Sequence, residues 1–366
     1  MSTATRRSPL TDWTVVVPVV ALLALALSWG RDLPGALVGL VALCLAGAVL
    51  AAVHHAEVVA HRVGEPFGSL VLAVAVTVIE VALIVTLMAD GGDKTASLAR
   101  DTVFAAVMIT CNGIVGLSLF VGALRNRVAV FNAEGSGAAL ATVATLATLS
   151  LVLPTFTTSK PGPEFSSAQL TFAAVASLAL YGLFIAVQTV RHRDYFLPVP
   201  TKTPAGGDDH AEPPTARAAL TSLGLLLVAL VAVVGDAKSV SPTIEKGVAD
   251  AGLPQAVVGV IIALLVLLPE TLAAVRAARR DRVQTSLNLG YGSAIASIGL
   301  TIPAIALASI WLDGPLLLGL GPIHMVLLTL TVVVGALTVV PGRATLLQGG
   351  VHLVLLAAYL FLAVSP

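Results

Sequence analysis

The sequence predicts an all-α, polytopic membrane protein with about 11 transmembrane helices. Of its 366 residues, 57% are hydrophobic and only 11% are charged, a balance that soluble domains do not have. Apolar runs of about 20 residues, enough to cross a bilayer as one helix, recur along the whole chain. The formal net charge is zero, so the composition gives no sign of nucleic acid as a partner.

The predicted helices follow one another with short connections that contain glycine, proline or charged residues. The first helix, after Arg6 and Arg7, resembles a signal sequence. Its apolar run is as long as a membrane span and lacks a convincing cleavage site before Arg31, so we interpret it as an uncleaved helix. The 11 runs cover approximately residues 13–30, 34–56, 68–89, 101–124, 136–154, 168–190, 217–235, 254–276, 287–311, 316–340 and 345–363.

The longest hydrophilic interruption is rich in proline and glycine, a composition typical of a flexible linker. It divides the predicted helices into two sets of five that follow the first helix. The predicted organisation is a cytoplasmic tail with the first helix (1–33), a first repeat (34–190), a cytoplasmic linker (191–216) and a second repeat (217–366).

The distribution of lysine and arginine predicts the orientation. With the N-terminus in the cytoplasm, 14 of the 20 basic residues fall on the cytoplasmic side and 6 outside, as the positive-inside rule requires. The C-terminus is then external. Because each set has an odd number of helices, the second repeat is inverted relative to the first. Transporters built this way bind their substrate near the midplane, where the repeats meet, and work by alternating access.

Two acids lie inside predicted spans, and each occupies the second helix of its repeat: Glu80 and Glu270. An ionised carboxylate at bilayer depth costs at least ~2.5 kcal/mol, so such acids face the protein interior and are functional by default. Thr77 lies three residues before Glu80 and so on the same helix face. Its hydroxyl is a candidate ligand, the alternative being a hydrogen bond to its own helix.

Polar residues of neighbouring spans extend this candidate site. Asn112 is expected to line it, with a hydrogen bond between helices as the alternative. Pro269 directly precedes Glu270 and predicts a helix break that leaves a backbone carbonyl beside the acid. The next helix adds candidate ligands at its start and along one face: Asn288, Ser293 and Ser297.

Two buried carboxylates and no soft sulfur or histidine cluster at depth predict hard cations such as Ca²⁺, Na⁺ or K⁺ as cargo. Burial favours the neutral carboxyl, so each glutamate can hold either a proton or a share of a cation. Mutually exclusive occupancy by cation and protons is antiport. No cofactor is expected, and the partners are inorganic cations, protons and the lipid bilayer.

Other polar residues have weaker claims to function. His54, His55, Glu57 and Glu134 could line a cytoplasmic vestibule, although a solvated cluster, or for Glu134 a helix-start acid, is the simpler interpretation. Asp236, Glu245 and Asp250 are expected in an external loop.

Three segments resemble the ChaA-type bacterial cation/proton antiporters of the cation/Ca²⁺ exchanger superfamily: HHAEVVAHRVGEPFGSLVLAVAVTVIEVALIVTLM, FNAEGSGAALATVATLATLSLVLPTFT and LLPETLAAVRAARRDRVQTSLNLGYGSAIASIGLTIPAIA. The resemblance implies a sodium/calcium exchanger-like fold in the bacterial cytoplasmic membrane and export of Ca²⁺, or Na⁺ and K⁺, in exchange for protons. The family's T-x-x-E signature falls on Thr77 and Glu80, and its second signature on Pro269 and Glu270. Its other polar site positions fall on Asn112, Asn288, Gly292, Ser293 and Ser297.

The GNATEL-like and GSATQ-like strings of other Ca²⁺/proton exchangers are not complete here, so a mainly Na⁺/K⁺:proton antiporter stays open as the alternative. An intramembrane hydrolase is the alternative from another class. Against it, EGSG at residues 134–137 misses the first glycine of the G-x-S-G motif of membrane serine proteases. A channel is a further alternative, but gating does not require inverted five-helix halves.

Overall fold

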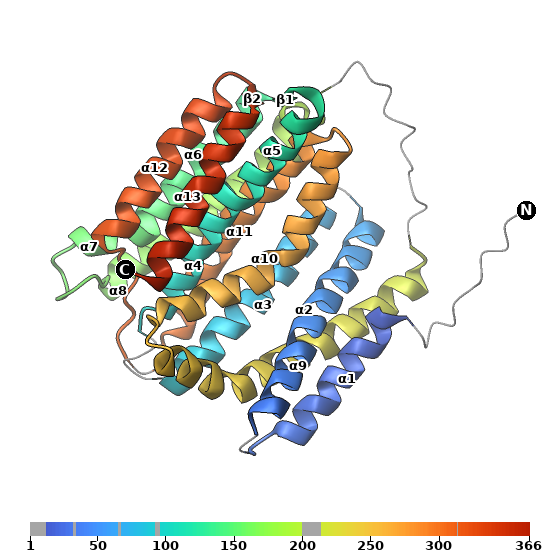
Figure 1. Ribbon diagram of the computed structural model, residues 1–366, viewed down its shortest axis with the longest axis vertical. Helices are drawn as coiled ribbons and strands as arrows, with labels where there is room; N and C mark the ends of the chain where they lie inside the picture. The colour runs from blue at the N-terminus through green and yellow to red at the C-terminus, as the bar shows by residue number, and fades with distance from the viewer. Residues whose placement is uncertain (1–11, 32–33, 65–66, 92–95, 200–213, 313) are drawn as a thin grey trace, which may run out of the picture. The chain divides into compact units, whose positions relative to one another are not determined.

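The computed structural model describes residues 12–31, 34–64, 67–91, 96–199, 214–312 and 314–366 (Figure 1). The predicted N-terminal tail up to residue 11 and most of the predicted linker, residues 200–213, lie outside this part of the chain. Within it, nine helices are long and apolar enough to cross a membrane, and two shorter apolar helices cover residues 13–28 and 74–89. Together they correspond one to one with the 11 predicted spans, which confirms the all-α, polytopic fold class.

The described chain divides into two compact units. The first contains residues 1–87 and 211–247 and is built on α1 (Trp13–Ser28), α2 (Gly35–Val63), most of α3 (Phe67–Gly91) and most of α9 (Ala216–Asp250). α1 begins after Asp12, whose carboxylate accepts a hydrogen bond from the Thr14 amide at 3.2 Å, as a helix N-cap does. α1 packs along α2 (Figure 1).

Helix α9 is longer than predicted, and this corrects the loop that was expected after residue 235. It continues through Pro242 to Asp250, so Asp236, Glu245 and Asp250 are helical. Tertiary packing extends the helix, because Val240 is buried in a cluster with Val38 and Val41 of α2. A propensity argument could not find this contact, since it joins residues about 200 positions apart.

The second unit contains residues 88–210 and 248–366. Its elements from the first repeat are α4 (Leu98–Met108), the π-helical η3 (Ile109–Ile114), α5 (Val115–Asn126), β1 (Val128–Val130), α6 (Ala133–Ala147), η4 (Thr148–Val152), α7 (Leu153–Phe156), α8 (Ser167–Ala186) and η5 (Val187–Arg191), which ends at the first residue of the predicted linker. The short η6 (Arg193–Phe196) lies within that linker. Those from the second repeat are α10 (Ala256–Arg279), α11 (Val283–Ala308), α12 (Pro322–Val339), β2 (Arg343–Thr345) and α13 (Leu346–Val364).

Within this unit, each repeat packs against the other through the same pair of elements. The last helix of the second repeat, α13, packs on α5, and the last helix of the first repeat, α8, packs on α11 (Figure 1). The loop before α6 pairs with the loop before α13 through antiparallel β1 and β2, with Val128 opposite Thr345. The loop before α8 pairs in turn with the loop before α12 through a bridge between Glu164 and Leu317. Such reciprocal pairing is what a two-fold relation between inverted repeats produces.

Glycines allow the closest of these helix contacts. A Cβ added to Gly349 of α13 would lie 2.6 Å from the backbone nitrogen of Phe120 in α5. A Cβ on Gly116 of α5 would lie 2.8 Å from the Cβ of His352 in α13. The two backbones therefore touch, as small residues permit between membrane helices.

Candidate cation and proton site

Glu80 and Thr77 lie on the buried face of α3. Their residues are 4% and 6% exposed, whereas Val74 and Val78 of the same helix are 43% and 44% exposed. In a membrane helix the exposed valines face lipid and the buried polar face is directed into the protein. The structure therefore places this predicted pair on one inward-facing surface of the first unit, three residues apart along the helix.

Glu270 is half-buried in α10, directly after Pro269. α10 is continuous from Ala256 to Arg279, so the predicted helix break at Pro269 is wrong. Membrane helices tolerate proline when neighbouring groups compensate for the lost amide donor. The carbonyl that loses its amide donor to Pro269 is that of Leu265, four residues earlier, whereas the Thr271 hydroxyl donates to the carbonyl of Leu267 at 2.7 Å.

Asn112 lies in the fully buried η3, and π-helical segments of this kind are frequent at functional sites. Its Nδ2 donates to the Thr331 Oγ1 of α12 at 2.8 Å, and its Oδ1 lies 3.1 Å from Nδ1 of His352 in α13. Both alternatives raised for Asn112 therefore stay open, since an amide that bridges helices can also offer its second lone pair to a cation. His352 was not predicted, although a histidine inside an apolar span is itself a signal.

The candidate ligands of α11 have different surroundings. The amide of Asn288 donates to the Phe196 carbonyl at 2.6 Å and accepts from Gln284 at 2.8 Å, so it ties α11 to η6. Ser293 is half-buried and Ser297 is buried. Their role as cation ligands stays a prediction. α11 packs on α10 and on η3, so the helices that carry Glu270, Asn112 and Ser297 share one bundle in the second unit.

The predicted vestibule residues differ in burial, and they are divided between the two units. His55 is 3% exposed, and its ring contacts the Thr14 carbonyl at 2.9 Å and the Ser222 hydroxyl at 3.3 Å, which joins α1, α2 and α9. His54 is half-buried with its ring 6.2 Å from that of Trp13, and Glu57 is exposed. Glu134, in the other unit, is exposed in the first turn of α6, where an acid favours the helix dipole.

Asp236, which was expected in an external loop, is a further buried acid. Asp236 of α9 is 0% exposed, and neither carboxylate oxygen has a hydrogen-bond partner among the described residues. The adjacent Gly235 packs against Leu25 of α1, so this stretch lies inside the first unit. In the same described part of the chain, no group of three or more histidine, cysteine or acidic side chains is arranged to hold a metal ion.

Replacing Asp236 by valine is expected to stabilise the protein by about 1–3 kcal/mol, because it removes a buried polar group that has no partner in the described structure. The measurement is thermal unfolding of the purified protein in detergent. Asp250→Val changes an exposed acid of the same helix and should stay within about 0.5 kcal/mol of the wild type. A loss of stability for Asp236→Val larger than that of the control would show that the carboxylate has a stabilising partner.

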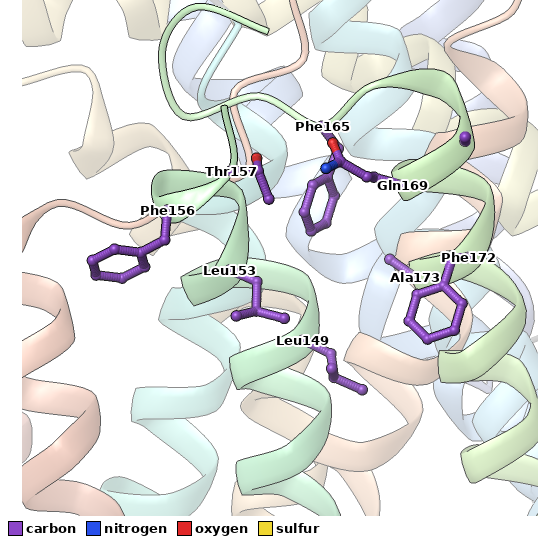
Figure 2. Close-up of a pocket in the computed structure, with 9 residues that line it drawn as sticks. Leu149, Leu153, Phe156, Thr157, Phe165, Gln169, Phe172 and Ala173 are labelled. Atoms are coloured by element: carbon purple, nitrogen blue, oxygen red, sulfur yellow. The ribbon is translucent and has the colours of Figure 1, made fainter. Parts of the chain in front are cut away.

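A pocket of about 390 Å³ lies in the second unit, and its lining contains none of the predicted cation ligands (Figure 2). Figure 2 shows aromatic and aliphatic side chains around it, with Thr157 and Gln169 as its polar groups. Phe156 and Phe172 on its rim are 67% and 65% exposed, as lipid-facing residues are. The lining is Leu149, Leu153, Phe156, Thr157, Phe165, Ala168, Gln169, Phe172 and Ala173, which includes no predicted ligand.

The reciprocal helix contacts and the acids inside the spans define a multi-pass membrane transporter built from inverted repeats. The profile of the family described as sodium/calcium exchanger protein matches residues 33–190 and 221–365. The chain therefore belongs to the sodium/calcium exchanger family. The two matched stretches lie close to the predicted repeats, although the boundaries of those repeats stay a prediction.

Two curated relatives match this chain over almost its whole length. It is 46% identical over 361 residues to the putative ionic transporter y4hA of Sinorhizobium fredii (strain NBRC 101917 / NGR234), covering 97% of this chain and 96% of that protein. It is 35% identical over 353 residues to the sodium-potassium/proton antiporter ChaA of Escherichia coli (strain K12), covering 95% of each. The solved Ca²⁺/H⁺ antiporter YfkE has a TM-score of 0.68 at 14% identity, covering 95% of this chain and 97% of that one, a likeness in fold.

These findings confirm the resemblance to ChaA-type antiporters. They also confirm a transporter rather than an enzyme, which removes the hydrolase alternative.

Proposed function

We propose that the protein exports cytoplasmic Ca²⁺ in exchange for external protons, by alternating access in the bacterial cytoplasmic membrane. Glu80 and Glu270 bind the cation or protons, and two glutamates can release two protons for one Ca²⁺ without leaving net charge on the site. The N-terminus is cytoplasmic and the C-terminus external, as the 14 to 6 distribution of basic residues favours. No cofactor takes part, since the metal ion is the cargo.

The observation that carries this proposal is the burial of Glu80 with Thr77 on the face of α3 directed into the protein. A carboxylate removed from water is neutral or paired with a cation, because the isolated charge is too costly. Oxygen ligands of this kind suit hard cations. In a chain of the exchanger family, a group that alternates between proton and cation is the element that antiport requires.

The second candidate is export of Na⁺ or K⁺ in place of Ca²⁺. It is favoured by the 35% identity, along 95% of both chains, to a protein named as a sodium-potassium/proton antiporter. Both candidates use the same residues and differ in the number and strength of the oxygen ligands around the cation.

Proton release from acidified inside-out membrane vesicles is expected when a transported cation is added, because the cation displaces protons from the site. Ca²⁺, Na⁺ and K⁺ are added separately, with vesicles that lack the protein as the control. A response to micromolar Ca²⁺ would establish Ca²⁺/proton exchange, and a response only to millimolar Na⁺ or K⁺ would establish the second candidate. No proton release with any of the three cations, from protein shown to be folded, would contradict cation/proton exchange.

A further inference from the structure

The side chain of His352 lies in the middle of a buried hydrogen-bonded chain that joins three spans of the second unit. The residue is 1% exposed. Its Nδ1 lies 3.1 Å from Oδ1 of Asn112, and its Nε2 lies 3.2 Å from Oγ1 of Thr338. The ring reaches η3 because α13 and α5 are in backbone contact at Gly116 and Gly349.

The chain continues on the far side of the asparagine. Nδ2 of Asn112 donates to the Thr331 hydroxyl at 2.8 Å, and that hydroxyl donates to the Leu327 carbonyl at 2.8 Å. The Thr338 hydroxyl in turn lies 2.8 Å from the Val334 carbonyl. Both ends of the Asn112 amide are therefore held, one by His352 and the other by Thr331.

Only two arrangements of hydrogen satisfy this chain around a neutral imidazole. In one, Nδ1–H of His352 donates to the amide oxygen, and Nε2 accepts from Thr338. In the other, the amide is turned, its NH₂ group donates to Nδ1, and Nε2–H donates to Thr338, whose hydroxyl donates to Val334. The Thr331 hydroxyl then donates to the amide oxygen in place of the Leu327 carbonyl. The tautomer of His352 and the direction of the Asn112 oxygen are thus coupled, and an amide with neither neighbour would be free to turn.

The equivalent contact in the other repeat has a different side chain. A Cβ on Gly299 of α11 would lie 2.8 Å from the Cβ of Tyr181 in α8, just as one on Gly116 would lie 2.8 Å from the Cβ of His352. The Tyr181 hydroxyl is buried without a hydrogen-bond partner among the residues the structure describes. Close packing of the two helices at this position therefore does not require a side chain that hydrogen-bonds to a neighbouring amide. The second repeat has a histidine here, in contact with Asn112.

We propose that His352 is a positioning residue for the transported cation: through its tautomer it sets the direction of the Asn112 carboxamide, and so the direction in which its oxygen is offered as a ligand. The inference rests on the proposed cation exchange. α10, which carries Glu270, packs on both η3 and α13, so this oxygen lies in the same bundle as one of the two acids. An amide oxygen free to turn presents a ligand only part of the time, which weakens cation binding more than it slows the transport cycle.

The experiment measures initial rates of cation-driven proton release against cation concentration in proteoliposomes, for the wild type and six variants. His352→Leu is expected to raise KM for the cation about 10-fold, because the Asn112 oxygen is then presented to the cation only part of the time, with a smaller change in kcat. His352→Asn keeps an amide at the position of Nδ1 and should restore most of the affinity. Thr329→Val, an exposed threonine of α12 bonded to its own helix, is the matched control for Thr338→Val.

Thr338→Val removes the partner that orients the ring and should raise KM in the same direction as His352→Leu, whereas Thr329→Val should not. A double variant of His352→Leu with Asn112→Leu should be no worse than Asn112→Leu alone, because the histidine acts only through the asparagine. Additive losses in KM, or an unchanged KM in a folded His352→Leu protein with an active wild type, would overturn the proposal. If His352→Leu does not fold, the proposal is tested by the KM values of Thr338→Val, expected to be raised, and of His352→Asn, expected to be close to the wild type. A wild type that shows no exchange with Ca²⁺, Na⁺ or K⁺ would instead overturn the proposed function.

Discussion

Glu80→Gln is expected to reduce cation-driven proton release at least about 100-fold, while the protein still inserts and folds. Removing one carboxylate from a desolvated cation costs about 3–5 kcal/mol, and each 1.4 kcal/mol corresponds to about a factor of 10. Glutamine keeps the volume of the side chain and has no charge to offer and no proton to release. Glu270→Gln is expected to have an effect of the same size, because the proposed exchange uses both carboxylates to neutralise Ca²⁺.

The matched control is Glu245→Gln, which changes a glutamate of α9 that accepts a hydrogen bond from Ser241 at 2.7 Å. It should retain exchange, since this acid lies near the end of its helix. Thr77→Val should have a smaller effect than Glu80→Gln, because it removes a neutral hydroxyl. Full exchange by a folded Glu80→Gln protein would contradict the assignment of Glu80, and full exchange by both glutamine variants would contradict the paired-acid site.

Gly349→Ala is expected to lower the free energy of unfolding by about 2–4 kcal/mol, near the upper end of what a single methyl group does. The added Cβ would lie 2.6 Å from the Phe120 nitrogen, 2.8 Å from its Cα and 3.0 Å from the Gly116 carbonyl oxygen. All three are backbone atoms, so no rotamer change can relieve the contact, and α13 must move away from α5. The same movement would separate His352 from Asn112.

Gly350→Ala is the control, because a Cβ at this neighbouring position meets no atom within 4 Å. Alanine there should be neutral or stabilise slightly, since it reduces the freedom of the unfolded chain. Thermal unfolding of both variants in detergent gives the comparison. Equal unfolding temperatures for the two variants would mean that α5 and α13 do not approach as closely as the structure has them.

Much of the fold was predictable because the bilayer imposes a simple rule on a sequence. Each span must satisfy its backbone hydrogen bonds internally and present about 20 apolar residues, so hydropathy alone located all 11 helices. The same rule made Glu80 conspicuous, since an acid in such a run is costly. Its inward direction also followed, because the exposed face of α3 is apolar at Val74 and Val78.

The helix ends and the partners of the buried polar side chains depended on contacts between residues far apart in the chain. Sequence ended α9 near residue 235, yet packing of Val240 against Val38 and Val41 carries the helix on to Asp250. Pro269 suggested a break that α10 does not have. The partners of Asn112 lie on η3's neighbours α12 and α13, more than 200 residues away, and no local pattern could pair them with it.

The sequence by itself determined that this protein is a membrane transporter of inverted repeats and which acids lie within its spans, because the cost of burying polar groups in lipid acts on every segment separately. Only the tertiary structure decided what each buried polar group touches. It placed Asp236 inside a helix without a partner in the described chain, tied Asn288 to η6, and joined His352 to Asn112 where two glycines let the backbones of α5 and α13 meet. Hydrogen bonds and close packing act over a few ångströms, so they follow from the fold.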